Sequence, residues 1–201
     1  MNNIHWLGHA SFKLTGEKII YIDPYEISET EKADIILITH THHDHLSMDD
    51  IEKIRKLDTV IFAPEDARSK LSDFKPVKPY QFFNVGKIRI ETVPAYNLDK
   101  EFHPEEKNWV GYVIEINGQR IYHAGDTDLI PEMSELKDID VALLPIGGTY
   151  TMDVTEALQA VNIIAPKIAI PMHYGKLSGT KMDAEKFKQL ASCKVELLQN
   201  E

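Results

Sequence analysis

Four histidines and one aspartate fall within residues 40–45, in the stretch THTHHDHLS. Because residues of equal parity near the end of a strand project to the same side, His40 and His42 could bind one metal ion together. Asp44 and His45 are adjacent, so their side chains diverge and could bind a second ion. Isolated histidines are usually solvated loop residues, but so many crowded imidazoles would repel one another when protonated. The pattern therefore predicts metal binding.

The types of these residues restrict the metal. Imidazole suits zinc, iron, manganese or nickel, and a carboxylate in the same set favours a hard or borderline cation whose bound water stays reactive. A helix is expected to start near Ser47, and its positive dipole end would help to keep Asp44 ionised.

Further ligands must come from other segments, because residues 40–45 alone cannot complete two coordination spheres. The candidates are His123, Asp126 and Asp128 in HAGDTD, and His173 in PMHYG. Each of these two segments directly follows a predicted strand, and strand ends at one edge of an α/β sheet are where such sites assemble. We therefore expect both segments to meet the histidine-rich stretch.

The elements that must position these residues are mostly short strands separated by turn residues. The run DIILIT is rich in isoleucine, which suits a strand covered on both faces. Asn117-Gly118 is a strong hairpin signal between two strands. Strands are expected within residues 3–7, 11–15, 18–22, 34–39, 59–63, 87–93, 111–116, 120–125, 140–148, 167–175 and 194–198.

Helices are expected between these strands. Ser47 followed by Asp50 resembles a capping box that opens a helix reaching to about Leu57. Pro64 could be the first residue of a second helix, in EDARSKL. Asp153 with Glu156 forms another capping box, and a last helix is expected around AEKFKQLA. This alternation of mixed strands and helices predicts an α/β architecture in which sheets are sandwiched between helices.

Composition and charge limit the class of protein. The 201 residues are 43% hydrophobic and 27% charged, which fits one soluble globular domain spanning residues 1–201. The net charge is -10 and no cluster of lysine or arginine stands out, so nucleic acid is a poor candidate partner. We expect a small-molecule substrate instead, and a single chain does not predict an oligomeric state.

Location follows from cysteine use and apolar runs. Cys193 is the only cysteine, so no disulfide can form within the chain. The N-terminus lacks the basic start and apolar segment of a signal peptide, and apolar runs such as IILI are far too short to span a bilayer. We expect a cytoplasmic protein with no membrane partner.

The ordered series HTHHDH, GDTD and MHYG resembles the signature of metallo-β-lactamase fold hydrolases over nearly the whole chain. WLGHASF, YIDP, IYHAGDTD and LLPIGGTYTM further resemble the small metal-dependent hydrolases related to ascorbate-6-phosphate lactonases. The resemblance implies a four-layer αββα sandwich with the metals at one edge of the two sheets. The ligands that it implies are His40 and His42 for the first metal, Asp126 as a bridge, and Asp44, His45 and His173 for the second.

One position departs from the pattern. Related proteins usually have a histidine just after the strand that ends here in VPAYN, but position 97 is Asn97. The nearest substitute is His103. Either its loop folds back and donates His103 to the first metal, which is the interpretation we favour, or that metal is held more weakly.

Two other residues match positions beside the site in relatives. His9 is one, and Asp23 is another. Asp23 could fix the tautomer of a ligating imidazole, or could simply form a turn before Pro24. His123 is expected either to line the pocket or to pack beside Tyr122. The loop of residues 97–108, with Lys100, His103, Lys107 and Trp109, is the candidate for substrate specificity, the alternative being an ordinary solvated loop.

The chemistry expected of such a site is hydrolysis. Two divalent ions, with zinc as first choice and manganese, iron or nickel as alternatives, can share a hydroxide because metal binding lowers the pKa of water towards about 7. Asp44 would orient this nucleophile or accept its proton, and the substrate would be a lactone or phosphoester of a small molecule. Two alternatives remain open: a di-iron redox protein on the same fold, disfavoured by His42 where such proteins have a carboxylate, and a metal-binding or regulatory module without turnover.

Overall fold

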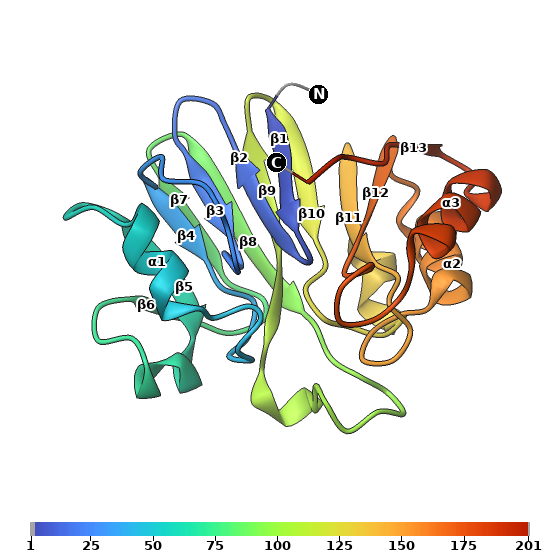
Figure 1. Cartoon of the computed structure of the whole chain (residues 1–201), viewed down its shortest axis with the longest axis horizontal. Coiled ribbons are helices and arrows are strands. Elements are labelled where there is room, and N and C mark those ends of the chain that lie inside the picture. The colour runs from blue at the N-terminus through green and yellow to red at the C-terminus, as the bar shows by residue number, and fades with distance from the viewer. Residues whose placement is uncertain (1–2, 201) are drawn as a thin grey trace.

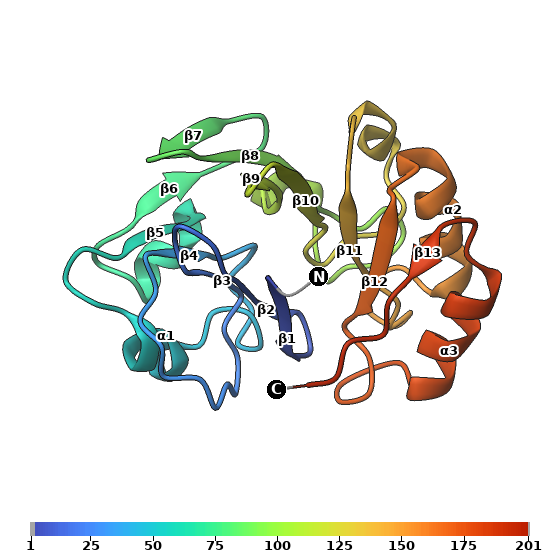
Figure 2. The ribbon, with the colours of Figure 1, turned by 90° about the horizontal axis from the view of Figure 1, so that it is seen from above.

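Residues 3–200, which the computed structural model describes, form two mixed β-sheets that face each other, with helices on their outer sides (Figures 1 and 2). In the first sheet β1 to β3 pair antiparallel and β3 to β6 pair parallel. Its strands, in spatial order, are β1 (Ile4–Gly8), β2 (Ser11–Leu14), β3 (Ile20–Ile22), β4 (Ile35–Leu37), β5 (Val60–Pro64) and β6 (Lys75–Val77).

The second sheet repeats this mixture. β7 to β10 pair antiparallel and β10 to β13 pair parallel. Its strands, in spatial order, are β13 (Lys194–Val195), β12 (Ile168–Met172), β11 (Val141–Pro145), β10 (Gln119–His123), β9 (Val110–Ile116), β8 (Ile88–Pro94) and β7 (Phe82–Val85).

Three α-helices cover the outer faces of the sheets in the part of the chain described. Figure 2 shows α1 (Met48–Ile54) beside the first sheet, and α2 (Val154–Ile164) and α3 (Lys181–Leu190) beside the second. Short 3-10 helices, η1 (Glu65–Ser69), η2 (Glu105–Lys107) and η3 (Pro131–Glu135), lie in the connections. The expected αββα sandwich is confirmed.

The strand β4 shows how the sequence produces these layers. Ile35 and Leu37 belong to the main hydrophobic core, which contains residues of both sheets. Ile36 and Ile38 point the other way and join a smaller cluster with residues of α1. Successive side chains of a strand alternate between its faces, so a continuous apolar run is needed where both faces are covered.

Local signals predicted some boundaries well. Asn117 and Gly118 have φ angles of 53° and 73°, and they join β9 to β10 as an antiparallel hairpin. The capping box at the start of α2 is also present, because Asp153 and Glu156 exchange hydrogen bonds.

The predicted end of the first helix at Leu57 is wrong. α1 ends at Ile54, and Arg55 is extended, with φ of -71° and ψ of 152°. The Lys56 N–H then donates to Thr59 Oγ1 at 2.8 Å, outside any helix. Leu57 is fully exposed, so its three-residue spacing from Ile54 reflected no buried face.

The predicted capping box of α1 is only half formed. Ser47 Oγ accepts from the Asp50 N–H at 3.4 Å, as expected. The Asp50 carboxylate, however, accepts from the backbone N–H groups of Glu26 at 2.8 Å and Ile27 at 3.2 Å. Asp50 therefore holds the loop after β3 against the start of α1.

Two further boundaries differ from the prediction. Pro64 is the last residue of β5 instead of the first of a helix, and EDARSKL contains only the short η1. In KVELL, the strand β13 comprises only Lys194–Val195. Within residues 3–200, none of the helices combines the length and the apolarity needed to cross a bilayer.

Candidate metal centre

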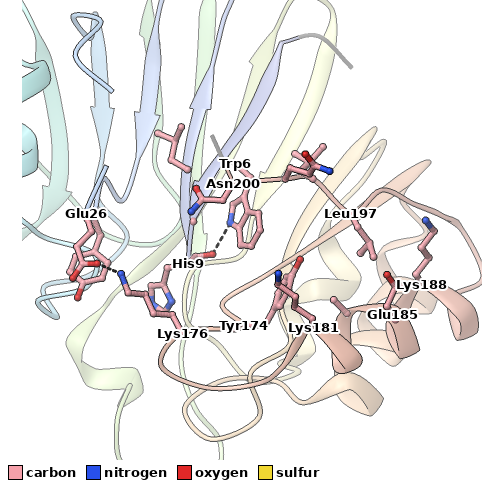
Figure 3. Close-up of a pocket in the computed structure, with 17 residues that line it drawn as sticks. Trp6, His9, Glu26, Tyr174, Lys176, Lys181, Glu185, Lys188, Leu197 and Asn200 are labelled. Atoms are coloured by element: carbon pink, nitrogen blue, oxygen red, sulfur yellow. Dashed lines mark hydrogen bonds and ion pairs between the residues drawn. The ribbon is translucent and has the colours of Figure 1, made fainter. Parts of the chain in front are cut away.

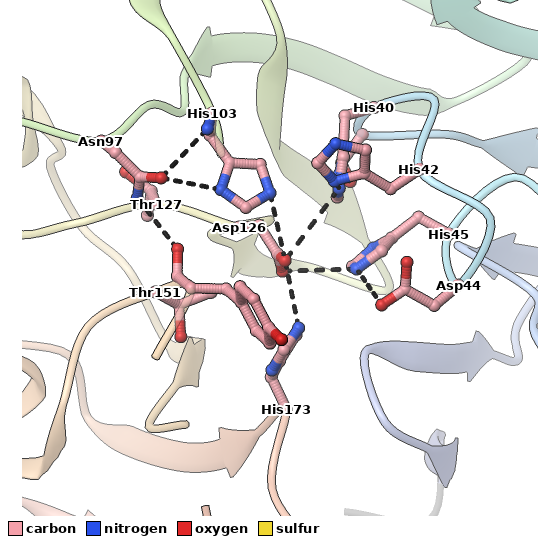
Figure 4. Close-up of polar contacts among 12 residues, drawn as sticks. His40, His42, Asp44, His45, Asn97, His103, Asp126, Thr127, Thr151 and His173 are labelled. Atoms are coloured by element: carbon pink, nitrogen blue, oxygen red, sulfur yellow. Dashed lines mark hydrogen bonds and ion pairs between the residues drawn. The ribbon is translucent and has the colours of Figure 1, made fainter. Parts of the chain in front are cut away.

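The predicted site residues meet at one edge of the two sheets, as Figure 4 shows. From the first sheet, residues 40–45 follow β4. From the second, Asp126 follows β10 and His173 follows β12, while His103 lies in the connection between β8 and β9. Segments more than a hundred residues apart therefore supply one site, as their placement after strand ends predicted.

One group of potential ligands consists of His40, His42 and His103. Each offers a nitrogen atom, and the three atoms lie within 4.8 Å of one another. His40 Nε2 lies 3.1 Å from His42 Nδ1. The loop that begins at Asn97 therefore folds back and places His103 beside the histidine pair.

A second group consists of His9, Asp44, His45 and His173, whose potential ligand atoms also lie within 4.8 Å of one another. Within this group, His9 Nε2 lies 3.0 Å from Asp44 Oδ2. His9 was expected only beside the site, but the structure places its ring within this group.

Asp126 lies between the two groups. Its Oδ2 is 3.4 Å from His103 Nε2 and 3.0 Å from His173 Nε2, and its Oδ1 is 3.4 Å from His45 Nε2. A carboxylate with one group on each side has the geometry required of a bridging ligand.

Asp23 anchors histidines of both groups. It is fully buried, and its carboxylate accepts hydrogen bonds from His45 Nδ1 at 2.7 Å, from Thr39 Oγ1 at 2.6 Å and from the Thr39 N–H at 2.8 Å. Because the Thr39 hydroxyl proton is given to Asp23, its oxygen accepts from His40 Nδ1 at 3.0 Å. Both imidazoles are thereby fixed with Nε2 turned to the cluster.

Asn97 anchors His103 in the same way. Its Oδ1 accepts from the backbone N–H of His103 at 3.0 Å and from His103 Nδ1 at 2.9 Å. Its Nδ2 donates to Asp128 Oδ1 and to the Tyr150 carbonyl, both at 3.0 Å. Position 97 thus orients the histidine that stands in for the missing one.

The buried polar atoms left without partners test whether this cluster fits metal ions. His45 Nε2, His103 Nε2, His173 Nε2 and Asp126 Oδ1 are all buried and accept or donate no hydrogen bond. Buried nitrogen and oxygen atoms are rarely left unpaired without a reason. Since imidazole nitrogens and a carboxylate oxygen are common ligands of divalent transition metals, the donor set fits two such ions.

The electrostatic field differs between the proposed ligands. Burial and the neighbouring His103 and His45 lower the pKa of His42 to about 4, so that ring is neutral at pH 7. Burial alone would raise the pKa of Asp126, but His173 and His45 hold it well below its usual range. Burial would lower the pKa of His45, yet Asp126 and Asp23 raise it well above normal. A field that favours a proton on His45 also favours a metal cation there.

Three residues of the site have backbone conformations that side chains rarely adopt. The φ angles are 51° for His9, 44° for Asp23 and 57° for His173. The His173 N–H donates to the His9 carbonyl at 2.9 Å, which ties two of them together. Such strain persists where the surrounding structure enforces it, and it concentrates at functional sites.

His123 and Asp128 have other positions. His123 Nε2 donates to the Ala10 carbonyl at 2.8 Å, and its Nδ1 accepts from the Gly125 N–H at 3.2 Å. His123 therefore shapes the turn that leads to Asp126 and lines neither cavity described below. Asp128 accepts from Asn97 and from the Leu98 N–H, and it pairs with Lys100.

A cavity of about 240 Å³ opens onto the cluster. Its lining residues are His42, His43, Asp44, Phe102, His103, Asp126, Tyr150, His173 and Leu177. Lys100 and Lys107, expected near the entrance, are absent from this lining, because Lys100 pairs with buried Asp128 and Lys107 lies over the Trp109 ring at 5.8 Å. Trp109 is buried against the rings of His40 and His42.

A larger cavity of about 790 Å³ lies between β1 and α3 (Figure 3). His9 is the residue of the two ligand groups that lines it. Lys176 also lines this cavity and pairs with Glu26. The ring of His9 thus stands between the larger cavity and the ligand cluster.

Three contacts to the histidine rings were not foreseen from the sequence, namely those made by Thr39, Asn97 and Ser178. Ser178 Oγ lies 3.2 Å from His173 Nδ1, so each of these residues contacts the nitrogen of a histidine that faces away from the cluster. Thr39 directly precedes a candidate ligand, which is a signal that could have been used. Asn97 and Ser178 carry no comparable local signal.

The comparisons with known proteins agree with this geometry. The family model of the beta-lactamase superfamily domain matches residues 3–173. A UPF0173 metal-dependent hydrolase from Thermococcus onnurineus is 37% identical, over 98% of this chain and 96% of its own length. The crystal structure of a protein assigned as a metal-dependent hydrolase from Parabacteroides distasonis is 38% identical with a TM-score of 0.89, covering 98% of this chain and 93% of that one. Igni18, a metallo hydrolase from Ignicoccus hospitalis, is 26% identical with a TM-score of 0.78, covering 98% and 94%.

Proposed function

Because this chain belongs to the beta-lactamase superfamily, and within it to the UPF0173 metal-dependent hydrolases, we propose that it binds two divalent ions and hydrolyses a lactone or phosphoester of a small molecule. The observation that carries the proposal is the position of Asp126 between two groups of imidazoles, with the buried Nε2 atoms of His45, His103 and His173 left without hydrogen-bond partners. The assignment to hydrolysis as a class comes from the family.

The proposed ligands follow the two groups. His40, His42 and His103 would hold the first ion, Asp44, His45 and His173 the second, and Asp126 would bridge them. Zinc is the first choice because three imidazoles form a common zinc site, with manganese, iron and nickel as alternatives. When bound, such ions supply Lewis acidity: they lower the pKa of water towards about 7 and polarise the oxygen of a bound substrate.

The chain's own residues would orient the reaction. Asp44 lines the cavity, and His9 holds one of its oxygens at 3.0 Å. The Asp44 carboxylate is therefore placed to orient a water molecule or to accept its proton. Burial would raise the pKa of Asp44, but the hydrogen bond from His9 and the field of His45 lower it, which keeps this carboxylate ionised at pH 7. The lactone half of the proposal rests on the sequence resemblance, and the proposed cytoplasmic location rests on the single cysteine and the short apolar runs.

The test combines metal content with activity. Asp126→Asn and His42→Ala are expected to lose bound metal and activity together, because each removes a proposed ligand. Metal per chain would be measured by elemental analysis of protein purified without a histidine tag. Activity would be followed as nitrophenol release from bis(nitrophenyl) phosphate and proton release from simple lactones, with and without added zinc or manganese.

His43→Ala is the matched control. His43 belongs to the same motif, but its side chain is 77% exposed and it lies outside both ligand groups. This variant should keep both ions. Full activity in a metal-free Asp126→Asn variant would refute the proposal.

A further inference from the structure

Three apolar side chains surround the mouth of the cavity beside the ligand cluster. Phe102 is 46% exposed, Leu177 is 43% exposed, and Tyr150, in the same lining, is partly exposed. The Phe102 and Tyr150 rings meet edge to face, with centroids 4.7 Å apart. Large apolar side chains left this exposed at a concave site indicate a binding surface. We call these three residues the apolar rim.

The apolar rim is held in a fixed position relative to the proposed ligands. Phe102 directly precedes His103, whose ring and backbone are bound to Asn97. Asn97 Nδ2 also donates to the Tyr150 carbonyl at 3.0 Å, which joins the two segments that carry the rings. Leu177 lies in the turn after His173, which closes through the Gly175 N–H and the Ser178 carbonyl at 3.1 Å. A preorganised surface loses little entropy when a ligand covers it.

Away from the proposed ions, the cavity offers a substrate no positively charged side chain of lysine or arginine from the described part of the chain. Among residues 3–200, its lining contains no lysine or arginine. Lys100 is turned to Asp128, and Lys176 pairs with Glu26 in the other cavity. The net charge of -10 also repels anions at long range. Some substrates would carry a phosphate group at a distance from the reacting atoms. In this cavity that phosphate would lose its water without gaining a positively charged side chain as a partner.

The size of the cavity limits the substrate as well. Its volume of about 240 Å³ is below the roughly 300–1,000 Å³ of typical pockets for drug-sized ligands. It can take a small group such as a phenyl ring or a short alkyl chain.

We propose that the apolar rim selects uncharged esters or lactones that carry a small apolar group, in preference to phosphorylated substrates. This inference rests on the proposed hydrolase function. In the reaction, the acyl C–O bond breaks, the oxygen of water joins the acyl carbon, and one proton of water goes to the leaving alkoxide. The apolar substituent would lie against Phe102, Tyr150 and Leu177 while the carbonyl faces the ligand cluster.

The test measures binding, so that it does not depend on turnover. Hydroxamates bind divalent metals through two oxygens, and three of them present different groups from one anchor: acetohydroxamic acid, benzohydroxamic acid and succinic acid monohydroxamate. Each would be titrated by calorimetry into the metal-loaded chain. We expect the phenyl compound to bind at least tenfold more tightly than the methyl compound, and the carboxylate compound to bind no more tightly than the methyl compound.

Phe102→Ala and Leu177→Ala should each reduce the preference for phenyl over methyl at least threefold. Leu98→Ala is the matched control, because Leu98 is 56% exposed in the same loop as Phe102 but does not line the cavity. It should leave the preference unchanged. Metal content is measured for every variant, so that a lost ion is not mistaken for a lost apolar contact.

Two results would overturn the inference while leaving the proposed function intact: a metal-loaded chain without preference for phenyl, or a preference unchanged in both rim variants. Tighter binding of the carboxylate compound than of the phenyl compound would also overturn it. A chain that retains no metal and binds none of the three compounds contradicts the proposed function, and this inference with it.

Discussion

At the scale of single residues, the candidate centre depends on side chains outside the proposed ligand set. Asp23 accepts hydrogen bonds from His45 and from both donors of Thr39, and Thr39 in turn fixes His40. One carboxylate therefore orients a histidine of each ligand group. Partners of this kind typically change metal affinity by about 10- to 100-fold when they are removed.

Asp23→Asn should lower the affinity for both ions by about tenfold or more. The amide can accept on one atom only, and its NH2 group would face a donor on the other side. The measurement is competition with a chromophoric chelator, with thermal unfolding as a check on folding. Dissociation constants within threefold of the parent for both ions would show that Asp23 is only a turn residue before Pro24.

Asn97→Ala should weaken one ion and spare the other. The His103 ring would lose its hydrogen bond to Asn97 Oδ1, so the affinity of the first ion should fall by about tenfold. Ser178→Ala is the counterpart, because Ser178 contacts the His173 ring, and it should weaken only the second ion. Stepwise titration with metal followed by elemental analysis separates the two sites. Equal loss at both sites in either variant would contradict independent anchoring.

At the scale of elements, Asp34 connects three segments. Its Oδ2 accepts from the Ile19 N–H at the start of β3 at 2.8 Å, and its Oδ1 accepts from Lys56 Nζ after α1 at 2.7 Å. Burial alone would raise the pKa of Asp34, but these two donors lower it below its ordinary value of 3.8. A carboxyl whose pKa is lower in the folded chain stabilises the fold above its unfolded pKa, and that stabilisation is lost as the pH falls through the folded pKa.

Asp34→Asn should therefore lower the midpoint of thermal unfolding at pH 7 by about 2–4 °C. The expected shift is small because solvent weakens the ion pair. The difference from the parent should begin to shrink below about pH 4, where the unfolded chain takes up the proton, and should vanish only below the lower folded pKa, where Asp34 is protonated in both states. Asp58→Asn is the control, because Asp58 also pairs with Lys56 but at 3.8 Å and with an 80% exposed side chain. A difference between parent and Asp34→Asn that stays constant from pH 7 to pH 3 would argue against this origin.

The elements also show which features a sequence can predict. Asn117-Gly118 and Asp153 with Glu156 were predicted correctly because the interactions are local, within two to four residues. Leu57 was placed in a helix wrongly because three-residue spacing does not reveal whether a core lies opposite. The gathering of the segments after β4, β10 and β12 was predictable, since each of them follows a strand at the same edge of the two sheets. The anchoring of His103 by Asn97 was not, because it depends on how a loop folds back.

At the scale of the whole molecule, the candidate centre lies where the two sheets meet. His40, His42 and His45 belong to the first sheet's loop, whereas Asp126 and His173 extend from the second. Ions bound by all of them would join the two sheets at this edge. The unmetallated cluster would instead leave carboxylates and unpartnered nitrogens buried together, which is unfavourable.

Removal of metal should therefore lower the stability of the entire chain in one step. Ligands that bind only the native state add about 4 kcal/mol when free ligand exceeds the dissociation constant a thousandfold. For a chain of this size that corresponds to a shift of about 10 °C in the midpoint of thermal unfolding. The experiment is calorimetry before and after dialysis against a chelator, with elemental analysis of both samples. The chelator should have a much smaller effect on Asp126→Asn, which lacks the proposed bridging ligand of both ions, and its full effect on Leu98→Ala. Because the main core contains residues of both sheets, one unfolding transition is expected in every sample. Two separate transitions would contradict a centre that holds the sheets together. So would an unchanged midpoint of unfolding after proven loss of metal.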